Sequence, residues 1–133
     1  MLQQRTAGPA RIAYAPLGDQ VVYPNMQADE AGHPLDGAKK YILHFDAEPL
    51  ALFWTLTSYA GGTEIGRCDA RHMTRNRDNS LTVFVQRSRP GAHGANWLAA
   101  PRGDFTITMR FYGPYRAILD GAWRLPPVRQ LEA

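Results

Sequence analysis

The sequence predicts an all-β fold, an antiparallel β-sandwich of jelly-roll type with one short helix near the C-terminus. Two observations carry this prediction. Four segments alternate between apolar and polar residues with a period of two and are bounded by Gly, Pro, Asp or Asn, which is typical of half-buried strands. No helical pattern is long enough to cover a sheet, so these strands can bury their apolar faces only against a second sheet.

Four strong strands and two weaker ones are expected. The strong strands span residues 41–46, 52–59, 81–87 and 104–112. The weaker ones are 20–25, where Pro24 favours an edge position, and 63–66, which follows the Gly61-Gly62 turn. The pattern leaves room for one or two more strands within 69–75 or after Gly121.

The helix is expected at residues 115–119. Pro114 precedes it, Gly121 follows it, and Pro126 and Pro127 prevent its continuation. Residues 1–18 contain two Gly and two Pro without sustained periodicity, which indicates an N-terminal arm. The chain of 133 residues is long enough for one apolar core, so residues 19–133 are expected to form a single β-sandwich domain.

Composition and charge indicate a soluble globular protein and argue against a nucleic-acid partner. Apolar residues make up 44% and charged residues 20% of the chain. The net charge is +3, but the 13 Arg and two Lys are spread along the chain. The densest basic run, residues 71–77, has three Arg and no aromatic residue, so it does not match a nucleic-acid surface.

No membrane segment or export signal is expected in the chain as written. No apolar run approaches the roughly 20 residues that a membrane helix needs, and residues 1–11 lack the apolar stretch of a signal peptide. We therefore expect a cytoplasmic protein, with an exported full-length form as the alternative. Cys68 is the single cysteine, which excludes an internal disulfide and favours an inert thiol.

Strand alternation places the candidate ligand-binding residues. In the strand at 104–112, Arg110 and Tyr112 fall on the face opposite the apolar Phe105 and Phe111. We expect a ligand pocket on the Arg110 side, with Trp97 at the end where this strand begins and with Trp54 and His44 as neighbours. The full set of candidate ligand-binding residues is Tyr23, His44, Trp54, Trp97, Arg110 and Tyr112.

Three of these candidates have two interpretations each. Trp97, in "ANWLAAP", either roofs the end of the sandwich at a corner, with Asn96 bonding to backbone, or offers a stacking platform to a flat ligand. Arg110 pairs either with an internal Asp or Glu or with the carboxylate of a ligand. His44 shares a face with Asp46, which suits either acid–base chemistry or an ordinary polar surface.

No metal ligand set, cofactor motif or catalytic set is visible. His33, His72 and His93 lie in separate loops, and the chain has no HxH, HxxxH or HExxH spacing. It has neither a GxSxG elbow nor a glycine-rich phosphate loop between a strand and a helix. We expect no metal and no cofactor, and we assign no catalytic residue. The segment "PLDG" is interpreted only as a turn before a strand.

Six ordered blocks of the sequence carry a family resemblance. They are "GHPLDGAKKYILHF", "FWTLTSY", "NRDNSLTVFVQ", "ANWLAAP", "FTITMRFYGP" and "GAWRLPPV". The chain resembles the domain of unknown function 1214 family, usually the C-terminal module of longer proteins that begin with the 1254 domain. The resemblance implies a double-sheet β fold and no settled activity. Asn79 stands where the family usually has Gly, and it tolerates the same left-handed backbone.

These observations lead to a binding module as the first functional hypothesis. We expect the domain to bind a small or carbohydrate-like ligand or a partner domain. The alternative is an enzyme that acts on a small organic substrate by acid–base chemistry in the sandwich mouth, with a site built from Tyr23, His44, Trp54, Arg110 and Tyr112. A homodimer is also possible on this reasoning, because a module that normally follows a partner domain can expose the surface which that partner covers.

Overall fold

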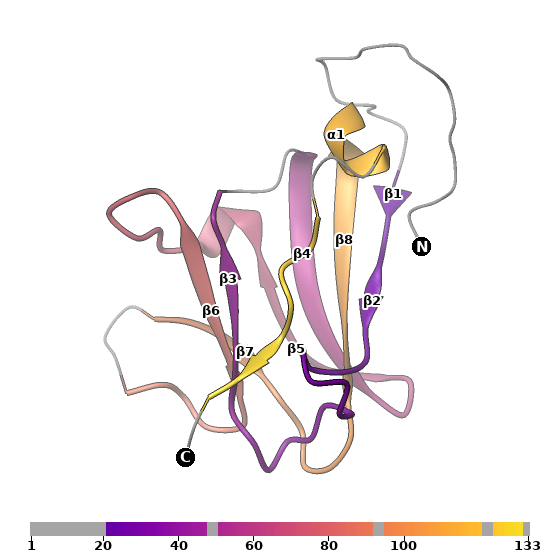
Figure 1. Cartoon of the computed structure of the whole chain (residues 1–133), viewed down its shortest axis with the longest axis vertical. Coiled ribbons are helices and arrows are strands. Elements are labelled where there is room, and N and C mark those ends of the chain that lie inside the picture. Colours follow the sequence, from indigo (N-terminus) through magenta and orange to yellow (C-terminus); the bar gives the residue numbers. More distant parts are fainter. Residues whose placement is uncertain (1–20, 48–50, 92–94, 121–123, 132–133) are drawn as a thin grey trace.

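The protein folds as two β-sheets that face each other across an apolar core (Figure 1). The computed structural model describes residues 21–47, 51–91, 95–120 and 124–131, so the predicted arm at 1–18 lies outside the described residues. The prediction of an all-β sandwich is confirmed. Each strong strand predicted from the sequence is present.

The first sheet has five strands, all paired antiparallel. They are β1 (Val21–Val22), β2 (Asn25–Met26), β4 (Ala51–Ala60), β5 (Thr63–Asp69) and β8 (Thr106–Pro114). The order is β1-β8-β4-β5, and β2 also pairs with β8. The β4–β5 hairpin turns at Gly61 and Gly62, whose φ angles of 58° and 83° favour glycine.

The second sheet has four strands, and one pair in it corrects the antiparallel prediction. Its strands are β3 (Tyr41–Phe45), β6 (Leu81–Gln86), β7 (Asn96–Ala99) and β9 (Arg129–Gln130), in the order β7-β6-β3-β9. β7 runs parallel to β6, with Val83 paired to Asn96 and Gln86 paired to Ala99. The segment interpreted as a corner around Asn96 and Trp97 is therefore a strand.

Two short helices complete the described elements. The predicted helix is confirmed as α1 (Arg116–Leu119), which buries Ile118 against the core at one end of the sandwich. A 3-10 turn, η1 (Ala70–His72), follows β5. Asn79 has a φ of 70°, which confirms the left-handed turn expected there. Within the described ranges, neither helix has the length or the apolar character needed to cross a membrane.

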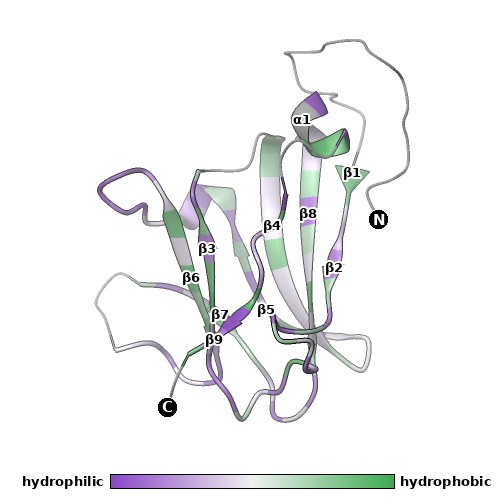
Figure 2. Cartoon of the chain, viewed as in Figure 1, coloured by the Kyte–Doolittle hydropathy of each residue, from purple (hydrophilic) through white to green (hydrophobic). Residues whose placement is uncertain are grey.

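The core consists of the inward residues of both sheets. Figure 2 shows hydrophobic residues along the paired strands and hydrophilic residues in the loops and in β9. Tyr41, Leu43 and Phe45 alternate inward from β3, as predicted, and Phe45 stacks on Trp54 of the opposite sheet with the ring centroids 6.2 Å apart. Ser58 also joins the sheets, because its buried hydroxyl donates to the Ala99 carbonyl at 2.6 Å.

Candidate functional site

The six predicted ligand-binding residues lie on three different surfaces. Tyr23, Arg110 and Tyr112 share the outer face of the five-stranded sheet. Trp54 points to the inner face of the same sheet, and its side chain is only 1% exposed. His44 and Trp97 belong to β3 and β7 of the other sheet. The structure therefore brings together three of the six.

Arg110 is held by a tyrosine. Its Nη2 donates a hydrogen bond of 2.9 Å to the Tyr59 hydroxyl, and its guanidinium lies 5.7 Å from the centroid of the Tyr59 ring. The expected internal Asp or Glu partner is thus replaced by Tyr59. The register that pairs Val22 with Phe111 and Asn25 with Thr108 places Tyr23 opposite Arg110.

Other charged and aromatic side chains on this face also have partners. Arg67 donates two hydrogen bonds, of 3.1 and 2.9 Å, to the Glu64 carboxylate, and they hold the pKa of Glu64 below its usual value. The Phe53 and Tyr112 rings lie 5.9 Å apart, and Arg71 lies over Phe53. We call this face the Arg110 surface, which comprises the outward side chains of β4, β5 and β8 together with Tyr23.

His44 and Trp54 are not neighbours of Arg110, so that part of the prediction is wrong. Trp54 alternates to the opposite side of β4, and His44 lies on β3, which pairs only with β6 and β9 among the described strands. The His44 Nδ1 atom is 3.0 Å from Thr82 Oγ1, and Nε2 is 3.7 Å from Asp46 Oδ1. The acid–base site of the enzyme hypothesis is not assembled in the described part of the chain.

The side chains of Asn96 and Trp97 bond to backbone. The Asn96 amide accepts from the Thr74 N–H and donates to the Thr74 and Thr82 carbonyls, at 2.8 to 2.9 Å. The Trp97 indole N–H donates to the Gln86 carbonyl at 2.9 Å, and Arg89 lies 4.9 Å above the ring. These contacts support the structural interpretation of "ANWLAAP".

A second candidate site lies where three strands of the four-stranded sheet end. β3 runs antiparallel to β6 and β7 runs parallel to it, so the start of β3 and the ends of β6 and β7 lie at one end of the sheet. Basic residues follow directly beyond these ends. They surround a hollow of about 470 Å³, which we call the basic pocket, lined by Gly37, Ala38, Lys39, Lys40, Arg87, Ser88, Ala100, Pro101 and Arg102.

Tight backbone contacts hold the walls of the basic pocket together. The Gly37 N–H donates to the Gly103 carbonyl at 2.8 Å, and the Ala100 N–H donates to the Gln86 carbonyl at 3.0 Å. A Cβ atom at position 37 would lie 1.6 Å from the Pro101 oxygen, so only glycine fits there. The two loops that form the walls are therefore fixed against each other.

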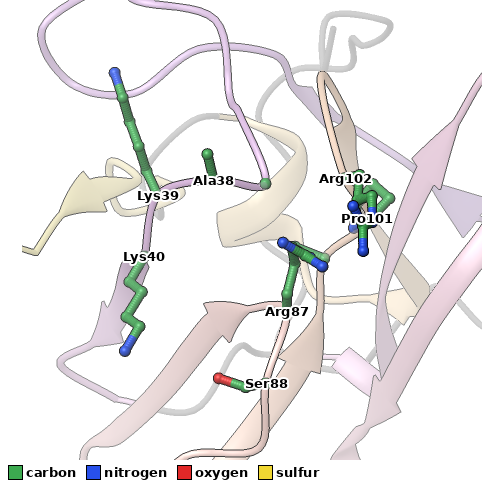
Figure 3. Close-up of a pocket in the computed structure, with 9 residues that line it drawn as sticks. Ala38, Lys39, Lys40, Arg87, Ser88, Pro101 and Arg102 are labelled. Atoms are coloured by element: carbon green, nitrogen blue, oxygen red, sulfur yellow. The ribbon is translucent and has the colours of Figure 1, made fainter.

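The basic side chains point in different directions around the hollow (Figure 3). Figure 3 shows Lys39 and Arg87 extending to one side of this end of the sheet and Lys40 to the other, with Arg102 across the hollow. The β3–β6 register ends with Tyr41 paired to Val85, and Lys39 lies before it in a turn, where its N–H donates to the Asp36 carbonyl at 2.9 Å.

The basic pocket is lined by four cations, and Lys39 also interacts electrostatically with Asp29, which lies outside the lining. Its four cationic side chains, Lys39, Lys40, Arg87 and Arg102, belong to exposed residues. No Asp or Glu is among its described lining residues, and none of the four cations forms an ion pair with a described carboxylate. An arginine fork matches the geometry of carboxylate and phosphate groups, so the pocket suits an anion.

Sequence reasoning missed this pocket because its residues come from three separate loops. "PLDG" was interpreted as a turn only, and Arg87 and Arg102 had no local motif. The available signal is that a basic residue stands just past the end of each of three strands. The signal becomes useful only when the order and direction of those strands are known.

A further hollow of about 390 Å³ is lined in part by the same two chain segments as the basic pocket. We call it the polar hollow, and its lining residues are Gln27, Pro34, Tyr59, Gly61, Gly62, Asp104, Phe105 and Thr106. Tyr59 is also the partner of Arg110, so the Arg110 surface borders this hollow. The described lining has one carboxylate and no cation, which is the opposite polarity to the basic pocket.

Cysteine and metal chemistry find no support in the described residues. Burial raises the pKa of the Cys68 thiol to about 12, so little reactive thiolate exists at neutral pH. No group of three or more His, Cys, Asp or Glu able to hold a metal ion is found within the described ranges. His33 and His72 lie apart, beside Asp29 and Asp69, and His93 is outside the described residues.

Comparisons with known proteins identify the family. The VPA0106 protein from Vibrio parahaemolyticus has a similar solved structure, with a TM-score of 0.73 and 26% identity over 84% of this chain and 31% of its own. An uncharacterised protein from Burkholderia cenocepacia shares the fold at a TM-score of 0.57 and 14% identity, over 92% of this chain and 32% of its own. This chain therefore spans about a third of the length of both.

The sequence comparisons are consistent with these structural neighbours. The search of curated proteins finds no match. The family model described as "Protein of unknown function (DUF1214)" matches residues 20–116, which is well over half of the chain. The chain belongs to the DUF1214 family.

Proposed function

We propose that this domain is a non-catalytic binding module whose basic pocket binds a small ligand through an anionic group, a carboxylate, phosphate or sulfate. One observation carries the proposal. Four cationic side chains surround a hollow that offers them no carboxylate partner among its described lining residues. An anionic ligand supplies the missing partner.

The size and construction of the basic pocket also support ligand binding. Its volume of about 470 Å³ lies in the usual range for small-molecule sites. The loops that line it stand on the ends of paired strands, and loops positioned by a rigid scaffold are common binding sites. Its charges are exposed, so we expect affinity to fall as ionic strength rises.

Binding is favoured over catalysis because no His, Cys, Asp or Glu is among the described residues that line the basic pocket. Its ionisable lining residues are two lysines and two arginines. The residues of the enzyme hypothesis are divided between the two sheets, with Trp54 inside the core.

A partner domain is the second candidate, favoured by the length of the two solved relatives. This chain spans about a third of each, so their remaining lengths hold other structure. The Arg110 surface is rich in Tyr, Phe and Arg, the residue types that protein interfaces favour. A partner domain or a second copy of the chain would use this surface rather than the basic pocket.

The test is an NMR titration of the 15N-labelled domain with inorganic phosphate, with sodium chloride adjusted to hold the ionic strength constant. We expect saturable shifts of the backbone amides of residues 37–40, 87–88 and 100–102. The double variant Arg87→Gln/Arg102→Gln should bind phosphate at least about tenfold more weakly, because it removes both arginine forks. Shifts spread evenly over all basic residues would contradict the proposal.

A matched control separates the pocket from net charge. The variant Arg77→Gln/Arg124→Gln removes the same charge from exposed positions outside the basic pocket, and it should retain wild-type affinity. Equal losses in both double variants would show that phosphate responds only to overall charge. Shifts confined to Tyr23, Arg110 and Tyr112 would instead favour the Arg110 surface as the binding site.

A further inference from the structure

The chain segments 34–40 and 100–106, which line the basic pocket and the polar hollow, lie at the end of the sandwich opposite α1 (Figure 1). Each segment contributes to both linings. Pro34 lines the polar hollow, and Gly37 lines the basic pocket three residues later. Arg102 lines the basic pocket, and Asp104 lines the polar hollow two residues later.

Their separation is therefore short. Three extended residues span at most about 11 Å and two span at most about 7 Å, so the two linings come within this distance of each other along both segments. The bridge between Asp36 and Asp104 lies between them, and the Phe105 N–H donates to the Leu35 carbonyl at 3.2 Å. This pairing keeps the two segments, and hence the two hollows, in a fixed relation.

The chemistry of the two hollows differs in a way that a single ligand can satisfy. The polar hollow offers the Asp104 carboxylate, the Gln27 amide and the Thr106 hydroxyl, all of which accept hydrogen bonds from hydroxyl groups. The Tyr59 ring adds an aromatic face, and its hydroxyl is held by Arg110. A carboxylate at Asp104 repels a second anion and directs the charged end of a ligand to the basic pocket.

We propose that the ligand is an acidic carbohydrate, in which a charged sugar occupies the basic pocket and an adjoining neutral sugar occupies the polar hollow. This inference rests on the proposed function of the basic pocket. The neutral sugar donates hydroxyl hydrogens to Asp104 and Gln27 and packs its C–H face on the Tyr59 ring. The charged sugar places its carboxylate or sulfate between Arg87 and Arg102.

The polarity of the polar hollow distinguishes this ligand from a polyanion. A nucleic acid or a polyphosphate carries a charge on every unit, so its next phosphate would approach Asp104 in a lining that holds no cation, with Arg110 at its border already bonded to Tyr59. A sugar next to the charged one carries hydroxyls instead. The neighbouring hollows therefore fit a ligand with one charged unit followed by an uncharged, hydroxyl-rich unit.

The test compares matched probes by isothermal titration calorimetry at fixed ionic strength. The acidic oligosaccharides are sialyllactose and glucuronosyl-xylobiose; the acid-only probes are N-acetylneuraminate and glucuronate; the neutral probes are lactose and xylotriose. We expect at least one acidic oligosaccharide to bind at least tenfold more tightly than its acid-only and neutral counterparts. If neither does, the inference is overturned.

Variants of the polar hollow test whether it provides the higher affinity expected for the acidic oligosaccharide. Gln27→Ala and Thr106→Val should each weaken the acidic oligosaccharide severalfold and leave phosphate binding unchanged. Gln130→Ala removes an exposed glutamine from β9, outside both hollows, and should change neither. An oligosaccharide gain that survives both Gln27→Ala and Thr106→Val would overturn the inference.

Failure of the inference is distinguishable from failure of the proposed function. One outcome is that phosphate binding depends on Arg87 and Arg102, but the neutral sugar adds no affinity. This outcome overturns the carbohydrate ligand and leaves the anion site intact. Oligosaccharide binding that is insensitive to Arg87→Gln/Arg102→Gln overturns both. Oligosaccharide binding that is lost in Arg87→Gln/Arg102→Gln and reduced in Gln27→Ala supports both the anion site and the carbohydrate ligand.

Discussion

The basic pocket and the Arg110 surface both contain arginines, but these arginines differ in whether they have partners within the fold. On the Arg110 surface, Arg110 bonds to Tyr59, Arg67 bonds to Glu64, and Arg71 lies over Phe53. In the basic pocket, four cations line one hollow, and none forms an ion pair with a described carboxylate. The difference follows from where each residue stands on its strand.

A mid-strand side chain on a sheet face has side chains of neighbouring strands within reach, so its charge finds a partner inside the fold. A residue just beyond a strand end lies in a loop, and its neighbours are the loop residues at the ends of the adjacent strands. At the end of β3, β6 and β7 those neighbours are other cations. Clustered charge that forms no ion pair within the described fold is thus the stronger indication of a ligand.

The largest expected effect tests the construction of the basic pocket. Gly37→Ala would place a Cβ atom 1.6 Å from the Pro101 oxygen, so the two loops must separate. We expect the free energy of unfolding to fall by about 3 kcal/mol or more in a urea titration, and phosphate binding to weaken with it.

A matched glycine provides the control for this change. Gly91→Ala meets no described atom within 4 Å of the added Cβ, so it should change stability by no more than about 0.5 kcal/mol. If Gly37→Ala were as stable as Gly91→Ala, the close approach of the two walls would be wrong, and the shape of the basic pocket with it.

The layers of the fold could be predicted from the sequence because burial imposes a simple period on a strand. The alternation at 41–45 and 105–111 places Tyr41, Leu43, Ile107 and Met109 among apolar residues on single faces, and all four are fully buried. β7 was missed because it has only four residues, and β9, with two residues, was expected only as an unplaced strand after Gly121. Pairing, rather than local pattern, makes them strands.

For the candidate sites, the sequence could predict only which residues of a single strand share a face. Alternation placed Arg110 and Tyr112 on one outer face correctly, but the partner Tyr59 lies 51 residues away and is set by the β4–β8 register. The basic pocket depends on a parallel β6–β7 pair, which no local pattern announces. Strand order depends on pairing between distant segments, which the pattern of one sequence does not indicate.

An intermediate effect tests the comparison directly. Arg110→Ala removes the bond to Tyr59 and the cover that the side chain gives to the sheet, so we expect a loss of about 1–2 kcal/mol in the free energy of unfolding. Arg87→Ala removes a cation with like-charged neighbours and should change stability by no more than about 0.5 kcal/mol.

The same pair of variants should respond oppositely in binding. Phosphate affinity should fall in Arg87→Ala and stay at the wild-type value in Arg110→Ala, measured by the same NMR titration. A stability loss in Arg87→Ala as large as that in Arg110→Ala would show that Arg87 has a structural partner. The contrast between the two regions would then fail.

The smallest expected effect concerns an imperfection of the Arg110 surface. Thr57 is fully buried, and its hydroxyl has no hydrogen-bond partner among the described residues. It lies between Thr55, which pairs with Arg110, and Tyr59, which bonds to Arg110, so the Arg110–Tyr59 contact bridges its position. Thr57→Val keeps the branched shape and removes the unpaired hydroxyl. We therefore expect a gain of about 0.5–1 kcal/mol in the free energy of unfolding.

The neighbouring position shows why the sign of this change is informative. Ser58 is equally buried, but its hydroxyl donates to the Ala99 carbonyl and accepts from the Gly66 N–H. Ser58→Ala leaves both groups unsatisfied and should therefore lower the free energy of unfolding by about 1–2 kcal/mol. Urea titrations of the two variants should thus shift in opposite directions. A destabilised Thr57→Val would mean that its hydroxyl is bonded in solution, and that Arg110 and Tyr59 do not close over it.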